Sequence, residues 1–384
     1  MNKILLLCPT PPPYAGPEVA SEILIRHLKD LPIDFEHMKA NLRTENWQKG
    51  KFDLKGIFAF TRVIKELIRK LYCNDIKKIY LLLSSSKVGF ARDSIYVLLA
   101  VLLSKKIIVH YRGGNFDGFY NKSPYLLKKF ITFILNRTDL IIVQANILRK
   151  MFDGITKTET AVLYNGLEKD EDTEEKKFNN DKTILLFIGH IAFSKGFYEL
   201  INVYKQIYKE NNLSLQFAGT FRFEGKKSKT QKAFLNGETL KLYNENSERI
   251  SLEIKEFVEN AESYNAKYLG IISGEYKEKI FKDSDILVLP SYTEGFSVTV
   301  LEALSKGLPV IVSNVGALPE IIREDLNGWV MEPGDEKSLK EKILKALQQK
   351  NNFEKISAEN TGYFKEKFLV DKIASQFVKI LTNV

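Results

Sequence analysis

The stretch ILVLPSYTEGFSVTVLEALSKG, residues 286–307, contains the pattern that decides the fold. Its first four residues are apolar and predict a short buried strand, which Pro290 ends because proline lacks the N–H that a strand ladder needs. A polar turn follows, and from Ser297 the apolar residues recur at helical spacing until Gly307 supplies a helix stop. A strand, a turn and a helix in this order form the repeating unit of a parallel α/β sheet.

The same unit recurs along the chain in two series, separated by an acidic, polar stretch. Strands are predicted at residues 3–8, 78–83, 106–109 and 140–143 in the first series, and at 183–188, 213–218, 286–289 and 309–312 in the second. Strands that alternate with helices favour two parallel sheets, each flanked by helices. We therefore predict an α/β chain with two Rossmann-like domains. That the two domains face each other across a cleft is implied by the family resemblance given below.

The domain boundaries follow from this pattern. We expect a first domain over residues 1–166, a linker over 167–182 and a second domain over 183–363. Residues 364–384 carry apolar side chains at helical spacing, which predicts a terminal amphipathic helix. That this helix packs back toward the first domain is implied by the family resemblance given below. The long polar segment 221–266 is interpreted as a surface elaboration that contains a helix near its end.

Charge is divided unevenly between the two halves. Residues 1–170 contain 27 Lys and Arg against 16 Asp and Glu, whereas the rest of the chain contains 30 against 32. A basic half attracts nucleic acid, an anionic membrane or a phosphorylated lipid, or is simply a solvated face. Because no nucleic-acid-binding module is recognisable, nucleic acid is not expected as a partner.

Two segments bear on membrane contact. The apolar run 94–103 is about half as long as a bilayer span requires and is interpreted as a buried helix. Residues 54–72 predict a helix with one apolar stripe and a basic remainder, which is typical of an interfacial helix and equally of a helix packed on a core. We expect a cytoplasmic protein that could contact the inner face of the plasma membrane without crossing it.

The strongest candidate for a ligand site is the junction inside residues 286–307. In parallel sheets, ligands bind where strands end and helices begin, because free amides and the helix dipole attract phosphate. Glu294 stands in the turn, Gly295 allows close backbone approach, and Glu302 lies in the helix. Carboxylates accept hydrogen bonds from vicinal sugar hydroxyls. A glutamate near a helix start is also a common cap, so the pair alone is a weak signal.

The wider sequence around this junction gives a specific resemblance. The segment PSYTEGFSVTVLEALSKGLPVIVSNVGALPEII, followed by NGWVMEPGD, resembles the donor-site signature of family 4, a large family of retaining glycosyltransferases with the GT-B fold. Shorter matches are FIGHIAFSKGFYELI (187–201), VLYNGLE (162–168), FAGT (217–220) and YLG (268–270). The likeness is dense over residues 183–345 and looser in the first half of the chain.

The resemblance implies roles for individual residues. Lys195 would bind the donor diphosphate, Glu294 the hydroxyls of the transferred sugar, and Glu302 the ribose hydroxyls. The remaining donor-binding residues would be Gly16, His190, Gly219, Gly295, Phe296, Ser297 and Thr299.

Two positions depart from the family pattern. His190 stands where the family often has an arginine, so an imidazole that is largely neutral at pH 7 replaces a permanent charge. The first loop commonly carries paired glycines, whereas here the order is Tyr14-Ala15-Gly16-Pro17. Diphosphate neutralisation would then depend more on Lys195 or on another cation.

The segment IIVHYRGGNFDGFY, residues 107–120, resembles the family's N-terminal strand and loop with a catalytic-region histidine before glycine. Its counterpart here is either Arg112, which directly precedes the glycines, or His110 at the strand end. The local pattern favours Arg112, and His110 is equally well explained as a hydrogen-bonded core residue.

The resemblance further implies transfer of a hexose-type sugar with net retention. The partners would be a nucleotide sugar, with a UDP-sugar favoured, and a saccharide or polyprenyl-linked saccharide acceptor of cell-surface polysaccharide synthesis. No cofactor and no metal are expected. The sequence Asp283-Ser284-Asp285 precedes a strand rather than following one, and no His/Cys cluster offers a zinc site.

Two other functions fit the sequence less well. A non-catalytic partner of another transferase would not need Glu294, Glu302 and Lys195 intact. A nicotinamide-dependent oxidoreductase would carry a G-x-G-x-x-G loop after the first strand, where this chain has prolines.

Overall fold

The computed structural model describes residues 3–12, 16–41, 54–73, 75–168, 176–178, 181–221 and 237–384. Tyr14 and Ala15 of the first loop, most of the expected linker and part of the segment 221–266 lie outside these ranges. The chain divides into two compact units: unit 1 is Met1–Glu168 with Lys367–Val384, and unit 2 is Lys169–Glu366. Each unit contains one six-stranded parallel sheet, so the predicted α/β class is confirmed.

The sheet of unit 1 has the strand order β2-β1-β3-β4-β5-β6. Its strands are β1 (Lys3–Cys8), β2 (Phe35–Lys39), β3 (Ile76–Leu83), β4 (Lys106–Tyr111), β5 (Leu140–Val143) and β6 (Thr160–Val162). In this sheet, the strands that the sequence analysis missed are the two edge strands, β2 and β6. The first reads FEHMK and the second has three residues, so neither shows the apolar run of a central strand.

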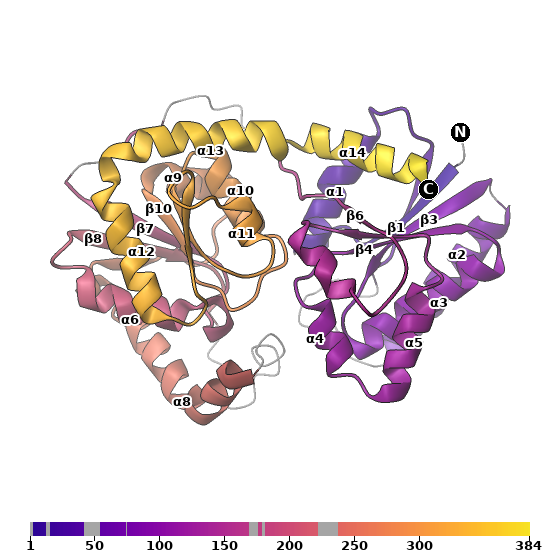
Figure 1. The fold of residues 1–384 in the computed structure, drawn as a ribbon, viewed down its shortest axis with the longest axis horizontal. Helices are drawn as coiled ribbons and strands as arrows, with labels where there is room; N and C mark the ends of the chain where they lie inside the picture. Colours follow the sequence, from indigo (N-terminus) through magenta and orange to yellow (C-terminus); the bar gives the residue numbers. More distant parts are fainter. Residues whose placement is uncertain are drawn as a thin grey trace. The chain divides into compact units, whose positions relative to one another are not determined.

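Helices cover both faces of this sheet. They are α1 (Gly16–Leu28), α2 (Leu54–Cys73), α3 (Lys87–Leu102), α4 (Phe116–Asn121), α5 (Tyr125–Leu135) and α14 (Val370–Asn383), with a 3₁₀ segment η2 (Ile147–Phe152). Because crossovers between parallel strands are right-handed, α1 lies on one face and α2, α3 and α5 on the other. In Figure 1, α3 lies between α2 and α5.

The C-terminal helix α14 packs against α1, which confirms the predicted return of the chain to the first domain. Phe377 of α14 is fully buried and meets the Tyr80 ring edge-on, at 4.9 Å between ring centroids. The buried Lys78 side chain of β3 donates from Nζ to the Leu381 carbonyl at 2.7 Å, which satisfies an unpaired acceptor in the last helical turn. Burial lowers the pKa of Lys78.

The expected single helix over 364–384 is two helices. The first, α13 (Phe353–Lys367), ends before Phe368, and α14 starts at Val370. Between them, the Leu167 amide donates to the Phe368 carbonyl and the Val370 amide donates to the Leu167 carbonyl. The Phe368 carbonyl and the Val370 amide, which a continuous helix would use for its own hydrogen bonds, are thus bonded to Leu167. These contacts interrupt the helix.

Unit 2 has the strand order β12-β11-β10-β7-β8-β9. Its strands are β7 (Thr183–Ile188), β8 (Leu213–Ala218), β9 (Ala266–Tyr268), β10 (Ile286–Leu289), β11 (Val310–Ser313) and β12 (Gly328–Met331). Its other helices are α6 (Phe197–Ile207), α8 (Gly237–Glu259), α9 (Gly274–Asp283), α10 (Val298–Ser305), α11 (Leu318–Ile321) and α12 (Glu336–Gln348), with η3 (Phe193–Lys195), η4 (Ala261–Tyr264) and η5 (Lys350–Asn352). By the same handedness, α6 and α8 lie on one face and α9, α10 and α11 on the other.

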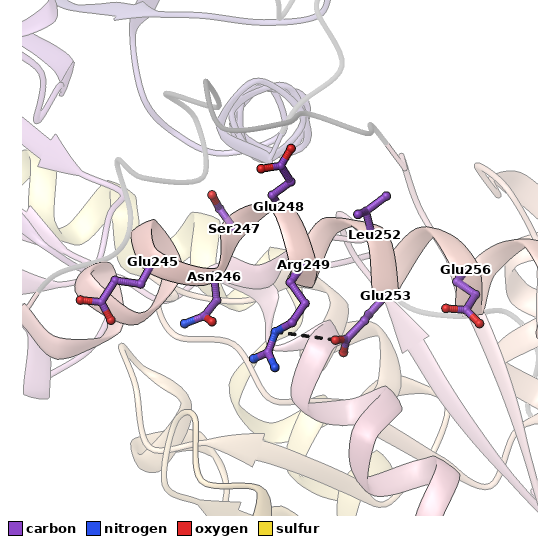
Figure 2. Close-up of a pocket in the computed structure, with 8 residues that line it drawn as sticks. All are labelled: Glu245, Asn246, Ser247, Glu248, Arg249, Leu252, Glu253 and Glu256. Carbon is purple, nitrogen blue, oxygen red and sulfur yellow. Dashed lines mark ion pairs between the residues drawn. The ribbon is translucent and has the colours of Figure 1, made fainter.

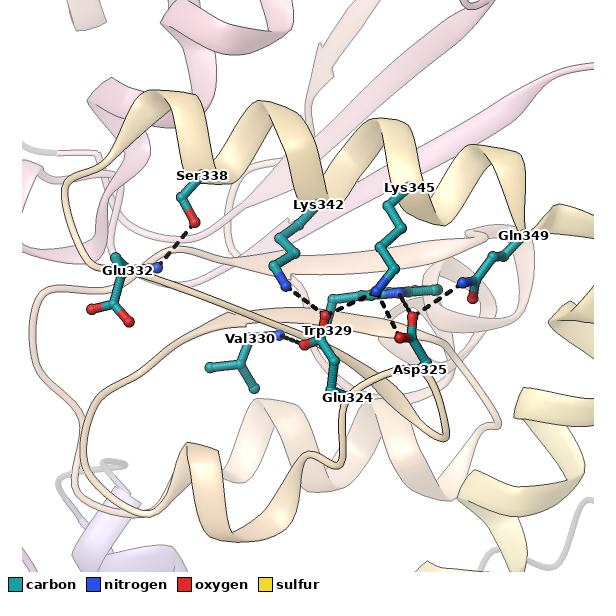
Figure 3. A network of polar contacts seen from close by, with 9 residues as sticks. All are labelled: Glu324, Asp325, Trp329, Val330, Glu332, Ser338, Lys342, Lys345 and Gln349. Carbon is teal, nitrogen blue, oxygen red and sulfur yellow. Dashed lines mark hydrogen bonds and ion pairs between the residues drawn. The ribbon is translucent and has the colours of Figure 1, made fainter.

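A polar network fixes α12 to the segment before β12 (Figure 3). Lys342 and Lys345 of α12 both bind Glu324, and Lys345 also binds Asp325 at 2.6 Å. The indole N–H of the buried Trp329 donates to Asp325 at 3.0 Å. These pairs lower the pKa of Asp325, chiefly through the hydrogen bond from Lys345. The tryptophan of the NGWV motif therefore has a structural role: its ring packs in the core, and its N–H is hydrogen-bonded to Asp325.

We predict that Phe377→Ala destabilises the protein by about 4 kcal/mol, because it removes a buried ring from the contact between α14 and the sheet of unit 1. Lys379→Ala, at an exposed position two residues further along α14, is the matched control. Urea unfolding followed by circular dichroism measures both. Equal stabilities for the two variants would show that α14 contributes little to the folding of unit 1.

Candidate active site

The candidate site of unit 2 lies where the strand order reverses. From β7 the chain continues to β8 and β9 on one side of the sheet, and from β10 it continues to β11 and β12 on the other side. Because β7 and β10 are adjacent, the loops that follow them leave neighbouring strands in opposite directions. Ligands of open parallel sheets bind outside the carboxyl ends of the strands at such a reversal. These two loops carry Lys195 and Glu294.

Lys195 and Glu294 meet directly. Lys195 Nζ lies 2.6 Å from Glu294 Oε1, and the Ser291 hydroxyl donates to the same oxygen at 2.8 Å. Both charged side chains remain partly accessible to solvent. An ammonium carries three N–H donors, so Lys195 can bind Glu294 and a phosphate oxygen together.

The backbone that supports this ion pair leaves no room for larger residues. Gly196, which follows Lys195, has φ +68°, and a Cβ at this position would lie 1.9 Å from the Pro290 carbonyl oxygen. The Tyr292 amide donates to the Ser194 carbonyl at 3.1 Å. The loop after β7 is therefore hydrogen-bonded to the loop after β10, which keeps Lys195 and Glu294 close together.

The turn residues after Glu294 lie at the start of α10. Ser297 is the N-cap residue of this helix, so the amides of its first turn, which includes Thr299, follow directly after Gly295 and Phe296. A neighbouring loop closes over the turn: the Ala317 amide donates to the Gly295 carbonyl at 2.9 Å. A helix start of this kind is suited to an anion.

Glu302 forms an ion pair with Lys277 rather than with Lys195. It lies in α10, and its Oε1 is 2.5 Å from Nζ of Lys277 in α9. Its Oε2 is buried and has no hydrogen-bond partner among the described residues. Lys277 was not identified from the sequence, because a lysine in a helix of sequence GEYKEKIFKD carries no distinguishing signal.

The glycine of FAGT lies beside the loop of His190. Gly219 has φ +138°, and a Cβ there would be 1.7 Å from the Gly189 carbonyl oxygen. His190 Nδ1 is hydrogen-bonded to the Thr220 hydroxyl, and Tyr268 donates from its hydroxyl to the Gly219 carbonyl at 2.8 Å. The ends of β7, β8 and β9 are thus joined by contacts that tolerate only glycine at this point.

In unit 1, His110 and Arg112 occupy different environments. His110 is 1% exposed, and its Nδ1 is 2.7 Å from the Tyr80 hydroxyl. Burial, followed by the nearby Arg112 charge, lowers its pKa well below the usual value. Arg112 donates to the Pro17 carbonyl at 3.1 Å and to the Ser21 hydroxyl at 3.2 Å, so its guanidinium lies on the first turn of α1, next to Gly16.

Of the two aspartates before β10, Asp285 binds the backbone of a neighbouring strand. Asp285 is buried, and its Oδ2 accepts a hydrogen bond from the Ile184 amide at 2.7 Å. Burial raises its pKa. In the part of the chain that the structure describes, no group of three His, Cys, Asp or Glu side chains is arranged to hold a metal ion.

With this geometry established, the comparison with known protein families is decisive. The model of the family described as glycosyl transferases group 1 matches residues 168–363, which is just over half of the chain and includes every contact described above in unit 2. The chain belongs to this family.

Relatives of this group 1 glycosyltransferase extend over both units. One, an uncharacterised glycosyltransferase of Methanocaldococcus jannaschii, is 27% identical over 94% of the chain and 92% of the relative. Another from the same organism is 25% identical, and the match spans 61% of the chain but only 53% of that relative. A capsular polysaccharide biosynthesis glycosyltransferase of Staphylococcus aureus, CapM, is 25% identical over 68% of the chain and 64% of CapM.

Solved structures establish the fold of the glycosyltransferase as GT-B. Sucrose-phosphate synthase from Thermosynechococcus elongatus superposes with a TM-score of 0.72 at 15% identity and covers 100% of this chain and 99% of its own. Anabaena HepE in complex with UDP-glucose superposes with a TM-score of 0.65 at 15% identity over the full length of both chains. The predicted fold family is therefore confirmed.

One residue of the site was missed because its signal is three-dimensional. Glu199, in the first turn of α6, is buried and accepts a hydrogen bond from the Tyr292 hydroxyl of the PSYTE turn. Its other oxygen, Oε2, is buried without a partner among the described residues. Burial raises the pKa of Glu199 to about 7, partly offset by the hydrogen bond from Tyr292.

A hollow on α8 lacks the features of a nucleotide site. All eight of its lining residues, Glu245 to Glu256, come from this one helix (Figure 2). Four of them are glutamates, and the single arginine, Arg249, lies 3.7 Å from Glu253. Such an acidic surface repels a diphosphate.

We predict that Glu199→Gln stabilises the glycosyltransferase above neutral pH. The folded-state pKa is raised from 4.5 to about 7, so the protonated carboxyl contributes stability that is present below pH 4.5 and lost as the pH rises through about 7. The amide cannot ionise, and we expect a gain of roughly 3 kcal/mol at pH 8 and little change at pH 4.5. Thermal unfolding across this range measures the effect. A gain that is equal at both pH values, or seen also with exposed Glu210→Gln, would contradict the assignment.

Proposed function

We propose that this chain is a retaining hexosyltransferase that uses a nucleotide diphosphate sugar, with a UDP-sugar as the preferred donor. Unit 2 would bind the donor, and unit 1 would bind a saccharide or polyprenyl-linked saccharide acceptor. The observation that supports the proposal most is the contact of Lys195 with Glu294 at the reversal of strand order in unit 2, beside the start of α10. It provides a cation, a carboxylate and free amides within one small volume.

The chemistry that this arrangement suits is departure of a diphosphate. The bond between the anomeric carbon and the β-phosphate oxygen breaks, and the oxygen leaves with the electron pair. Lys195 and the amides at the start of α10 stabilise the negative charge that develops there. Glu294 accepts hydrogen bonds from hydroxyls of the sugar, and Glu302 accepts them from the ribose.

Retention follows if the acceptor hydroxyl attacks on the face that the diphosphate leaves. The acceptor oxygen then forms the new bond to the anomeric carbon, and its proton passes to the departing phosphate oxygen. The protein supplies charge stabilisation and excludes water, and a separate protein base is not required. No metal ion is part of the proposed reaction.

The biological setting is proposed from the relatives and from charge. CapM is named for capsular polysaccharide biosynthesis, and HepE binds UDP-glucose. None of the described helices combines the length and apolarity needed to cross a bilayer. We propose action in cell-surface polysaccharide synthesis, in the cytoplasm at the inner face of the plasma membrane.

The proposal predicts that Glu294→Gln lowers transfer by on the order of 10²-fold or more, because the amide cannot replace the charge that orients Lys195 and the sugar. Glu253→Gln, on α8, is the control for loss of a glutamate outside the site. Mass spectrometry of reactions with a panel of nucleotide sugars measures product formation. Wild-type turnover by Glu294→Gln would exclude its assigned role.

A second prediction concerns unit 1. Arg112→Ala should lower kcat more than His110→Ala does, since His110 lies in the core and Arg112 lies on the first turn of α1. His110→Ala should instead give the larger fall in Tm, because it leaves a cavity and an unpaired Tyr80 hydroxyl. Kinetics measured well below both unfolding transitions separate the two effects. The reverse ranking in kcat would assign the role to His110.

A further inference from the structure

One face of unit 1 is apolar although it is open to solvent. The outer stripe of α3 contains Val88, Ile95, Leu98 and Leu102, which recur at helical spacing and are all exposed, Leu102 by 78%. The interpretation of residues 94–103 as a buried helix is therefore wrong for this stripe, although Tyr96, Val97 and Ala100 on the inner side are buried.

The neighbouring helix α5 extends this surface. Leu126, Phe130 and Phe133 are exposed on its outer side, Leu126 by 78%. Phe130 stacks on Phe133, with 6.4 Å between ring centroids, and meets Phe90 of α3 edge-on at 6.3 Å. The contact through Phe90 joins the two helices, so their outer stripes form one surface. The exposed residues Val88, Ile95, Leu98, Leu102, Leu126, Phe130 and Phe133 are called the apolar face.

Cations surround the apolar face. Lys129 lies over the Tyr125 ring at 4.6 Å, and Arg137 lies over the Phe133 ring at 3.3 Å. On the other side of α3, α2 presents Arg62, Lys65 and Arg69 to solvent. Long basic side chains that lie along aromatic rings keep their charges at the edge of an apolar surface.

Carboxylates are nearly absent from the same region. Residues 54–138 contain 16 Lys and Arg but only four Asp and Glu. On α3 and α5, the single carboxylate is Asp93, which is buried and paired with Arg92 at 2.7 Å. The positive charge around the apolar face is therefore not neutralised by side chains of α3 or α5.

The apolar stripe of α2, which from the sequence could have been an interfacial membrane helix, packs on the domain instead. Its residues Val63, Leu67 and Leu71 are buried, and Phe60 meets Tyr96 of α3 at 5.9 Å. The helix thus packs on the domain by its apolar side and exposes its basic side. The exposed apolar surface lies instead on α3, which packs against α2, and on α5, which packs against α3.

We propose that the apolar face docks on an anionic lipid bilayer, with Leu98, Leu102, Leu126 and Phe133 entering the headgroup boundary and the surrounding Lys and Arg binding lipid phosphates. This proposal rests on the proposed function. Docking of the apolar face would place unit 1 beside a polyprenyl-linked acceptor in the membrane. An apolar surface with a cationic border matches a bilayer that is apolar inside and negative at its surface. A second copy of the chain would bring two basic surfaces together, which like-charge repulsion opposes.

The test uses the full-length chain and vesicles that sediment. We expect wild-type protein to bind vesicles of phosphatidylcholine with one-third phosphatidylglycerol, to bind phosphatidylcholine alone at least tenfold more weakly, and to be released by salt. The combined variant Leu98→Gln with Phe133→Ser should lose at least tenfold in affinity for the anionic vesicles. Leu252→Gln with Ile271→Gln, which removes exposed apolar side chains from unit 2, should bind as wild type does.

The other readouts separate this inference from the proposed function. The apolar-face variant should keep the wild-type Tm and wild-type binding of free UDP, and Glu294→Gln should keep wild-type vesicle binding. Failure of the wild type to bind anionic vesicles, or equal binding by the two double variants, would overturn the proposal. A wild-type dimer that the apolar-face variant converts to a monomer, with no vesicle binding, would assign the face to a second copy.

Discussion

The candidate site of unit 2 depends on the contact between Lys195 and Glu294, which lie on loops that leave two neighbouring strands in opposite directions. Lys195 and Glu294 are 99 residues apart in sequence, yet their side chains are in contact. The contact is possible because β7 and β10 are neighbours in the sheet and because Gly196 lets the first loop approach the Pro290 carbonyl. The same strand reversal that creates an open edge thus sets both the charge and the shape of the site.

Much of this arrangement could be predicted because its signals are local. The central strands are apolar runs, and the strand, turn and helix of residues 286–307 lie within one stretch of sequence. What the sequence could not provide were contacts between distant segments. The polar edge strand β2, the pairing of Lys277 with Glu302 and the burial of Glu199 under Tyr292 all depend on which elements become neighbours. The break between α13 and α14 has the same cause, because it follows from the backbone contacts of Leu167.

The two units divide their surface chemistry. Unit 2 has nearly balanced charges and brings Lys195 and Glu294 together at one pair of loops, whereas unit 1 carries the basic excess beside an exposed apolar face. A soluble domain gains nothing in stability from exposed Leu, Ile and Phe side chains, and contiguous apolar surfaces of this kind usually mark an interaction site. A transferase whose acceptor carries a lipid would need such a surface on the unit that receives the acceptor.

The proposed function requires that a sugar nucleotide binds at the carboxyl ends of β7 and β10. A crystal structure of the chain with a bound UDP-sugar tests it most directly. We expect a diphosphate oxygen within hydrogen-bonding distance of Lys195 Nζ, the sugar hydroxyls on Glu294 and the ribose on Glu302. A diphosphate bound away from Lys195, with the contact between Lys195 and Glu294 unchanged, would contradict it.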